Sequence, residues 1–167
     1  MVTLRRILAL AAALSLCRAA PAQVALGDPF PALPSAGLSG SLPDTSGKVV
    51  LVDFWASWCA PCKASFPAYS RIQADYAAKG LVIVAVSVDD SPAAFAAFVT
   101  KMRPGFATVH DGSHKLVAQV QVPTMPTSYL IDRTGKVRFM HAGFRGSETE
   151  REIRKELDQL LAAGGSP

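Results

Sequence analysis

The sequence predicts one α/β domain, in which a central mixed β-sheet is flanked by helices. Half of the 167 residues are hydrophobic, which is enough for one core and little beyond it. Short β-branched and aromatic runs alternate with longer segments of helical periodicity, and strand-helix-strand order implies a right-handed parallel crossover. A later pair of strands joined by a tight turn adds antiparallel pairing, so the sheet is predicted to be mixed.

The chain is expected to begin with a secretory signal peptide at residues 1–22, followed by a domain at residues 23–167. Arg5 and Arg6 precede an apolar run at residues 7–17, and small residues suited to cleavage follow it. That run is shorter than the roughly 20 residues that cross a bilayer. A membrane anchor and a lipid on Cys17 are alternatives; the favoured location is the periplasm.

The first half of the domain predicts turns, two strands and two helices. Residues 24–47 are rich in Pro, Gly and Ser, which favours turns and short edge strands. Residues 49–55 have the composition of a strand buried on both faces. A helix at residues 63–79 carries core side chains at helical spacing, and a second strand at residues 81–88 leads through Ser-Pro into a helix at residues 93–102.

The second half predicts a strand and helix pair, a hairpin and a final helix. The short strand covers residues 106–109 and the short helix residues 113–120. Residues 127–132 and 137–142 flank a Gly-containing turn, which is typical of an antiparallel hairpin. The final helix is expected to start with a capping box formed by Ser147 and Glu150.

The cysteines are the strongest chemical signal in the sequence. Cleavage of the signal peptide would remove Cys17, leaving Cys59 and Cys62 two residues apart. So short a loop constrains the unfolded chain little, which indicates a reactive pair and not a structural one. Because Cys59 lies where the 49–55 strand leads into a helix, helix N–H groups should lower its pKa and make it the attacking thiolate. Cys62, one turn further on, would resolve the mixed disulfide.

The segment Trp58-Cys59-Ala60-Pro61-Cys62 resembles the active-site motif of the thioredoxin superfamily. This resemblance implies a thioredoxin-like fold and thiol:disulfide oxidoreductase activity. It also implies roles for three further residues: Asp53 as a buried acid exchanging protons with Cys62, Pro67 as the proline that kinks the helix, and Pro126 as a cis-proline packed against the disulfide. Pro123 is a weaker candidate for that last role.

Two other positions are implied to bind substrate. Trp58 resembles the aromatic platform beside the nucleophile, although core packing is an alternative for it. Met125, before Pro126, would offer its backbone to an extended client segment, as in strand addition. Within the superfamily the chain resembles the TlpA/ResA-like group, which implies an N-terminal hairpin at residues 24–47 and a central strand-helix insertion at residues 106–120.

The chain departs from related patterns at two positions, one near the buried acid and one after the second cysteine. A carboxyl in a buried strand should have a raised pKa, unless Asp53 faces water at the strand end. The lysine that lies near this acid in thioredoxins has no counterpart, because residues 81–88 contain no lysine. ResA-like reductants typically have a glutamate three residues after the second cysteine, and this chain has Ser65 at that position.

The expected function is thiol-disulfide exchange with cysteine-containing client proteins, as a reductant recharged by a membrane electron donor, for example in cytochrome c or copper-site maturation. A thiol oxidant or isomerase, a thiol peroxidase and a copper(I) carrier using both cysteines remain alternatives. Zinc is not expected, because four ligands are needed, there is no second cysteine pair, and His110, His114 and His141 would have to converge from three segments.

Other partners are excluded on composition. Without the basic residues of the signal segment, 14 Lys and Arg face 13 Asp and Glu, so no nucleic-acid partner is expected. No Gly-rich phosphate loop is visible, and no cofactor is expected. The protein is predicted to be a monomer.

Overall fold

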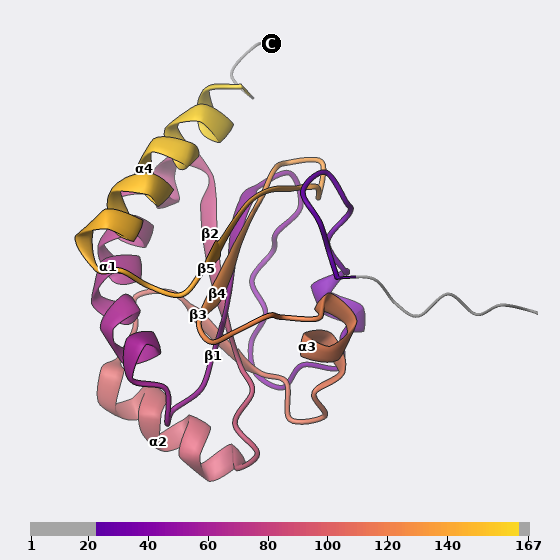
Figure 1. Cartoon of the computed structure of the whole chain (residues 1–167), viewed down its shortest axis with the longest axis vertical. Coiled ribbons are helices and arrows are strands. Elements are labelled where there is room, and N and C mark those ends of the chain that lie inside the picture. Colours follow the sequence, from indigo (N-terminus) through magenta and orange to yellow (C-terminus); the bar gives the residue numbers. More distant parts are fainter. Residues whose placement is uncertain (1–22, 164–167) are drawn as a thin grey trace, which may run out of the picture.

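The computed structural model describes residues 23–163, and its centre is a five-stranded mixed sheet with the order β3-β2-β1-β4-β5 (Figure 1). β2 pairs in parallel with both β1 and β3, while β4 pairs antiparallel with β1 and β5. The predicted mixed α/β sheet is therefore confirmed. The strands are β1 (Val49–Trp55), β2 (Leu81–Ser87), β3 (Ala107–His110), β4 (Thr127–Ile131) and β5 (Val137–Ala142). The predicted signal segment lies outside the described residues.

Helices cover both faces of the sheet (Figure 1). One face packs under α1 (Ala60–Tyr76), α2 (Pro92–Met102) and α4 (Ser147–Ala162), and the other under α3 (Lys115–Val120) and the N-terminal segment. A short 3₁₀ turn, Ala77–Lys79, extends α1, and another, Leu33–Ser35, lies in the N-terminal segment. Within residues 23–163, no helix combines the length and apolar character needed to cross a membrane.

Alternation along β1 decides which side chain faces which layer. Val50, Val52 and Phe54 join the core on the α3 side. Val49 and Leu51 join the core under α1 and α4, and since Asp53 continues their alternation, it points to that layer. An acid is thus placed in the middle of a hydrophobic face, directly below the helix that carries the cysteines.

The predicted N-terminal hairpin is wrong. Within the described part of the N-terminal segment, the backbone pairs with the rest of the sheet through two isolated bridges, Pro29 with Lys136 and Ser39 with His110. The Ser39 and His110 backbones exchange two hydrogen bonds of 2.8 and 2.9 Å. β3 and β5 are the edge strands, so each has backbone groups without a partner inside the sheet. The described N-terminal segment pairs with these edges and not with itself, as a hairpin would.

The predicted capping box of the last helix is also wrong. α4 begins at Ser147 with Gly146 in the capping position, and no side chain caps that end. Glu150 instead contacts Arg71 of α1 at 2.6 Å and Arg154 of its own helix at 3.0 Å. The carboxylate that the sequence assigns to capping thus joins α4 to α1.

Candidate active site

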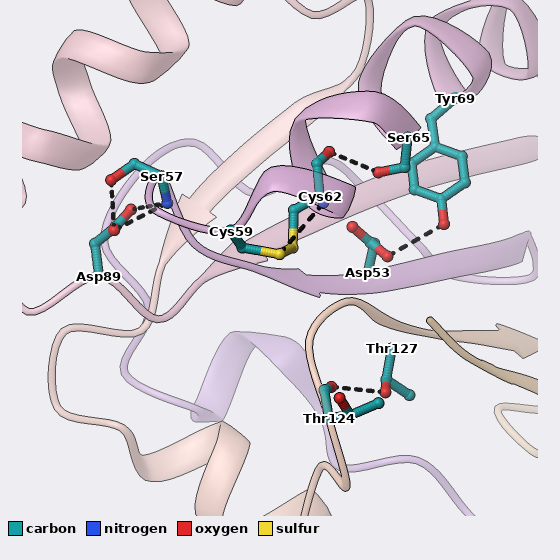
Figure 2. Close-up of a disulfide and its surroundings, with 9 residues drawn as sticks. All are labelled: Asp53, Ser57, Cys59, Cys62, Ser65, Tyr69, Asp89, Thr124 and Thr127. Carbon is teal, nitrogen blue, oxygen red and sulfur yellow. Dashed lines mark hydrogen bonds between the residues drawn. A yellow bond between two sulfur atoms is a disulfide. The ribbon is translucent and has the colours of Figure 1, made fainter. Parts of the chain in front are cut away.

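The cysteine pair lies at the N-terminal end of α1, where β1 runs into the helix (Figure 2). Cys59 occupies the N-cap and forms a disulfide with Cys62 in the first turn. The Cys62 N–H donates a 3.2 Å hydrogen bond to the Cys59 sulfur. Cys59 is 5% exposed and Cys62 is fully buried, so an incoming sulfur can reach Cys59 first.

Cys59 lies at the helix N-terminus, as the sequence predicts, and its sulfur contacts a backbone N–H there. A backbone N–H at the first turn stabilises negative charge on the sulfur it contacts. When the disulfide is opened, the same N–H would hold the Cys59 thiolate. Neither Ala60 nor Pro61 has a side-chain donor, so stabilisation of that thiolate by the intervening residues is confined to the backbone.

Asp53 is a fully buried acid on β1, and the alternative that it faces water is wrong. Its Oδ1 accepts a 3.2 Å hydrogen bond from the Tyr69 hydroxyl, while its Oδ2 has no partner among the described residues. Burial raises the pKa of Asp53 well above its ordinary value, and the hydrogen bond from Tyr69 opposes that rise. Figure 2 shows the Asp53 carboxyl group lying between Cys62 and Tyr69.

Tyr69 is a site residue that sequence reasoning missed, because its helical spacing assigned it to the core. It is 1% exposed, and its hydroxyl interacts with Asp53, Ser128 and Ser65. Burial, followed by the proximity of Asp53, raises the pKa of Tyr69 well above its usual range. The neighbour of Asp53 on β2 is Ala85, so β2 offers Asp53 no polar side chain at this position. The Tyr69 hydroxyl is the polar group that contacts Asp53 instead.

Asp89 is a second missed residue, and it fixes the loop before Cys59. The carboxylate accepts hydrogen bonds from the Ser57 N–H at 3.0 Å and the Ser57 hydroxyl at 2.7 Å (Figure 2). It also accepts one from the Ser87 hydroxyl at 2.8 Å. Asp89 is 2% exposed. Its position directly after a predicted strand was visible in the sequence, but its partner in a distant loop was not.

The Met125-Pro126 segment completes the surroundings of the disulfide. The peptide bond between these residues is cis, whereas Pro123 is exposed. Met125 is half-buried and packs against the cluster that contains Cys59 and Cys62. The structure thus brings Cys59, Cys62, Asp53, Pro126 and Met125 to one end of the sheet.

Trp58 is 68% exposed, so the core-packing alternative for it is wrong. It directly precedes the more exposed cysteine and makes an aromatic surface beside it. Trp55, three residues earlier, takes the core position instead and packs against Phe66 and Phe98.

The histidines do not converge on the cysteines. His110 Nε2 lies 2.6 Å from the Asp89 carbonyl oxygen, and His141 Nε2 lies 2.6 Å from the Glu156 carboxylate on α4. Over residues 23–163, no group of three or more His, Cys, Asp or Glu side chains is arranged to hold a metal ion.

Comparison with known proteins places this geometry in a family. The AhpC/TSA family model matches residues 27–140. Thioredoxin-like protein YneN of Bacillus subtilis is 35% identical over 125 residues, which cover 73% of this chain and 71% of the relative. Thiol-disulfide oxidoreductase ResA of Oceanobacillus iheyensis is 36% identical over 96 residues, 58% of this chain and 50% of that protein. The chain thus aligns with about half the length of that ResA.

A solved structure agrees with both the fold and the chemistry. The crystal structure of a Chlorobium tepidum protein assigned as thiol:disulfide interchange protein DsbE superimposes with a TM-score of 0.77 at 36% sequence identity. The match covers 83% of this chain and 99% of that one. The chain therefore belongs to the AhpC/TSA family, as a thioredoxin-fold thiol-disulfide oxidoreductase homologue whose redox pair is Cys59 and Cys62.

Proposed function

We propose that the protein is a periplasmic disulfide reductant that exchanges its Cys59–Cys62 pair with the cysteines of client proteins. The observation that carries this proposal is the asymmetric burial of the pair over a buried acid. Cys59 is the less buried cysteine, Cys62 is enclosed, and the Asp53 carboxyl group lies beside Cys62, between it and Tyr69. In that arrangement Cys59 would attack the client, Cys62 would resolve the mixed disulfide, and Asp53 would accept the proton from Cys62.

The reaction begins with attack of the Cys59 thiolate on a client disulfide. One client sulfur leaves as a thiolate, and the other becomes bonded to Cys59. Cys62 then loses its proton to Asp53 and attacks Cys59, which releases the second client thiolate and leaves the Cys59–Cys62 disulfide. Two electrons pass from the pair to the client, and Cys59, the less buried of the two cysteines, is the one that reacts with the partner.

Limited stabilisation of the Cys59 thiolate supports the reducing direction. A strongly stabilised thiolate favours the reduced pair and makes a protein an oxidant. Here the contacts found for the Cys59 sulfur within the described residues include one backbone N–H, and the Ala60-Pro61 dipeptide has no side-chain donor. The disulfide is then comparatively stable, which is what a reductant requires.

The surface around the pair suits a protein client. Trp58, next to Cys59 in the sequence, is exposed, and Met125 adjoins the same cluster, where its backbone would pair with an extended client segment. A monomer in the periplasm would receive electrons from a membrane donor through the same accessible sulfur. The cysteines of apocytochrome c or of a copper site are clients of the right chemistry.

Trapping of the mixed disulfide tests this function. Cys62→Ser should accumulate a covalent adduct with a disulfide-containing protein such as insulin, because the resolving sulfur is absent. Cys59→Ser should form none, and the reduced wild type should reduce insulin without accumulating the adduct. The adduct is measured by mass spectrometry under non-reducing conditions.

The same proteins separate the proposed function from its rivals. Stoichiometric copper retained by the wild type and lost in Cys59→Ser, with no insulin adduct, would indicate a copper carrier. Rapid consumption of peroxide by reduced wild type without client adducts would indicate a peroxidase. Either result contradicts the proposal.

A further inference from the structure

We propose that Tyr69 is the positioning residue of the exchange reaction: it holds Asp53 by one oxygen and leaves the other, Oδ2, to take the proton from Cys62. This inference rests on the proposed function and assigns the acceptor to a single atom. It also assigns a role to a phenol that helical periodicity places in the core.

The first support is the division of the Asp53 carboxyl group between two uses. Oδ1 is occupied by the Tyr69 hydroxyl at 3.2 Å, and Oδ2 is buried without a partner among the described residues. An unpartnered buried oxygen is costly unless something else compensates it. In Figure 2 this free oxygen is the one turned toward the cysteines, where a Cys62 thiol could donate to it.

The second support is that Tyr69 is itself held in place. Ser128 lies opposite Asp53 in the register of β1 and β4, and its side chain interacts with the Tyr69 hydroxyl, as does that of Ser65. The Tyr69 ring packs edge-on to Phe106 and Phe144. Contacts on both the ring and the hydroxyl orient the donor toward Asp53.

The third support is the lack of charge on the strands that flank Asp53. Its direct neighbours are Ala85 on β2 and Ser128 on β4, and neither side chain carries a charge. On α1, the groups that face it are Cys62, which exchanges the proton, and Tyr69. Because Tyr69 stays protonated over the working pH range, it stabilises the carboxylate as a neutral donor.

The proton balance of the resolving step follows. The Cys62 proton moves to Asp53 Oδ2, and the electron pair left on Cys62 forms the bond to the Cys59 sulfur. The bond between Cys59 and the client breaks, and the client departs as a thiolate. Asp53 keeps the proton in the oxidised protein, in line with the raised pKa of this buried acid.

The test is the pH dependence of this step in the full protein. A mixed disulfide of Cys59 with glutathione is prepared, and its resolution by Cys62 is followed by glutathione release from pH 5 to 10. In Tyr69→Phe the carboxylate loses its donor, so the midpoint that depends on Asp53 should move up by about one pH unit. Below the midpoint, resolution should then be about tenfold slower than in the wild type.

A matched control and a double variant make the test specific. Tyr76→Phe removes another buried hydroxyl from α1, one that faces the Arg154 carbonyl, and should leave the profile unchanged. In an Asp53→Asn background, Tyr69→Phe should change the rate less than twofold. If Tyr69→Phe fails to fold, Ser128→Ala removes a hydroxyl that holds Tyr69 and should move the midpoint in the same direction by less.

Three outcomes would overturn the inference. The first is a pH midpoint of resolution in Tyr69→Phe that equals that of the wild type. The second, if Tyr69→Phe misfolds, is an unchanged midpoint in Ser128→Ala. Equal slowing by Tyr69→Phe with and without Asp53 is the third, because it would indicate a purely structural role. A wild type that never resolves the adduct would instead contradict the proposed function itself.

Discussion

Two buried carboxyl groups flank the disulfide, and their hydrogen bonds give them different tasks. Asp89 accepts hydrogen bonds from Ser57 and Ser87 on both of its oxygens, so its role is to fix the loop. Asp53 has one donor and one free oxygen. Burial with an incomplete set of donors makes the neutral form of Asp53 favourable, which suits a group that takes up a proton.

Replacement of Asp53 by Asn should stabilise the oxidised protein in a pH-dependent manner. The pKa of Asp53 is higher in the folded than in the unfolded state, so the folded state holds the proton more tightly. Wild-type stability should then fall as pH rises from about 4 to the folded pKa, by about 1.4 kcal/mol for each unit between the two values. Asp53→Asn removes that loss, so its advantage should grow with pH.

Urea unfolding of both oxidised proteins at pH 4 and pH 8 measures this difference. Asp90→Asn is the control, because the Asp90 side chain is 95% exposed and should leave the free energy of unfolding nearly unchanged at both pH values. A stability difference between Asp53→Asn and wild type that is the same at pH 4 and pH 8 would contradict the assignment.

The active-site loop depends on a link between two elements. Asp89, just beyond β2, binds the backbone and hydroxyl of Ser57 in the loop that joins β1 to α1. β1 and β2 are themselves parallel neighbours, so the link extends their pairing to the loop that carries Trp58 and Cys59. The end of one strand thereby sets the position of the nucleophile.

Loss of this link should affect both stability and reaction rate. Asp89→Ala leaves the donors of the half-buried Ser57 and the buried Ser87 without their acceptor, and we expect the free energy of unfolding to fall by about 2–4 kcal/mol. Insulin reduction should slow several-fold because the Cys59 loop is less fixed. The neighbouring Asp90→Ala, on the exposed side, serves as the comparison. Equal stability and rate in the two variants would show that Asp89 does not fix the loop.

Local signals in the sequence sufficed for most elements. The β1 run, the Ser-Pro start of α2 and the turn between β4 and β5 are each encoded by neighbouring residues, and β1, α2, β4 and β5 lie within one residue of their predicted bounds. α1 begins and ends three residues before its predicted bounds. The hairpin at residues 24–47 and the capping box at Ser147 failed because tertiary partners took over their polar groups.

The residues of the site also separate into those that local sequence predicts and those that depend on tertiary contacts. Cys59, Cys62 and Asp53 could be proposed from one strand and one turn of helix. Tyr69 could not, because apolar periodicity does not show that a core phenol ends on a carboxyl group. The register that sets Ser128 opposite Asp53 depends on a strand far along the chain.

At the scale of the whole molecule, the sheet brings distant segments to one end. β1 delivers Cys59 through its loop, β2 delivers Asp89, and the segment before β4 delivers Met125 and Pro126. These strands are adjacent in the order β2-β1-β4, so the fold needs no further element to assemble the site. The exposed Trp58 ring lies beside this end, where a client chain can approach Cys59.

The reduction potential of the Cys59–Cys62 pair tests the central claim most directly. The measurement is an equilibration of metal-free protein against a glutathione or dithiothreitol buffer, with the oxidised fraction read by thiol alkylation and mass spectrometry. A disulfide reductant should give a value of about −250 mV or lower. A value above about −150 mV would make the protein an oxidant and contradict the proposed direction.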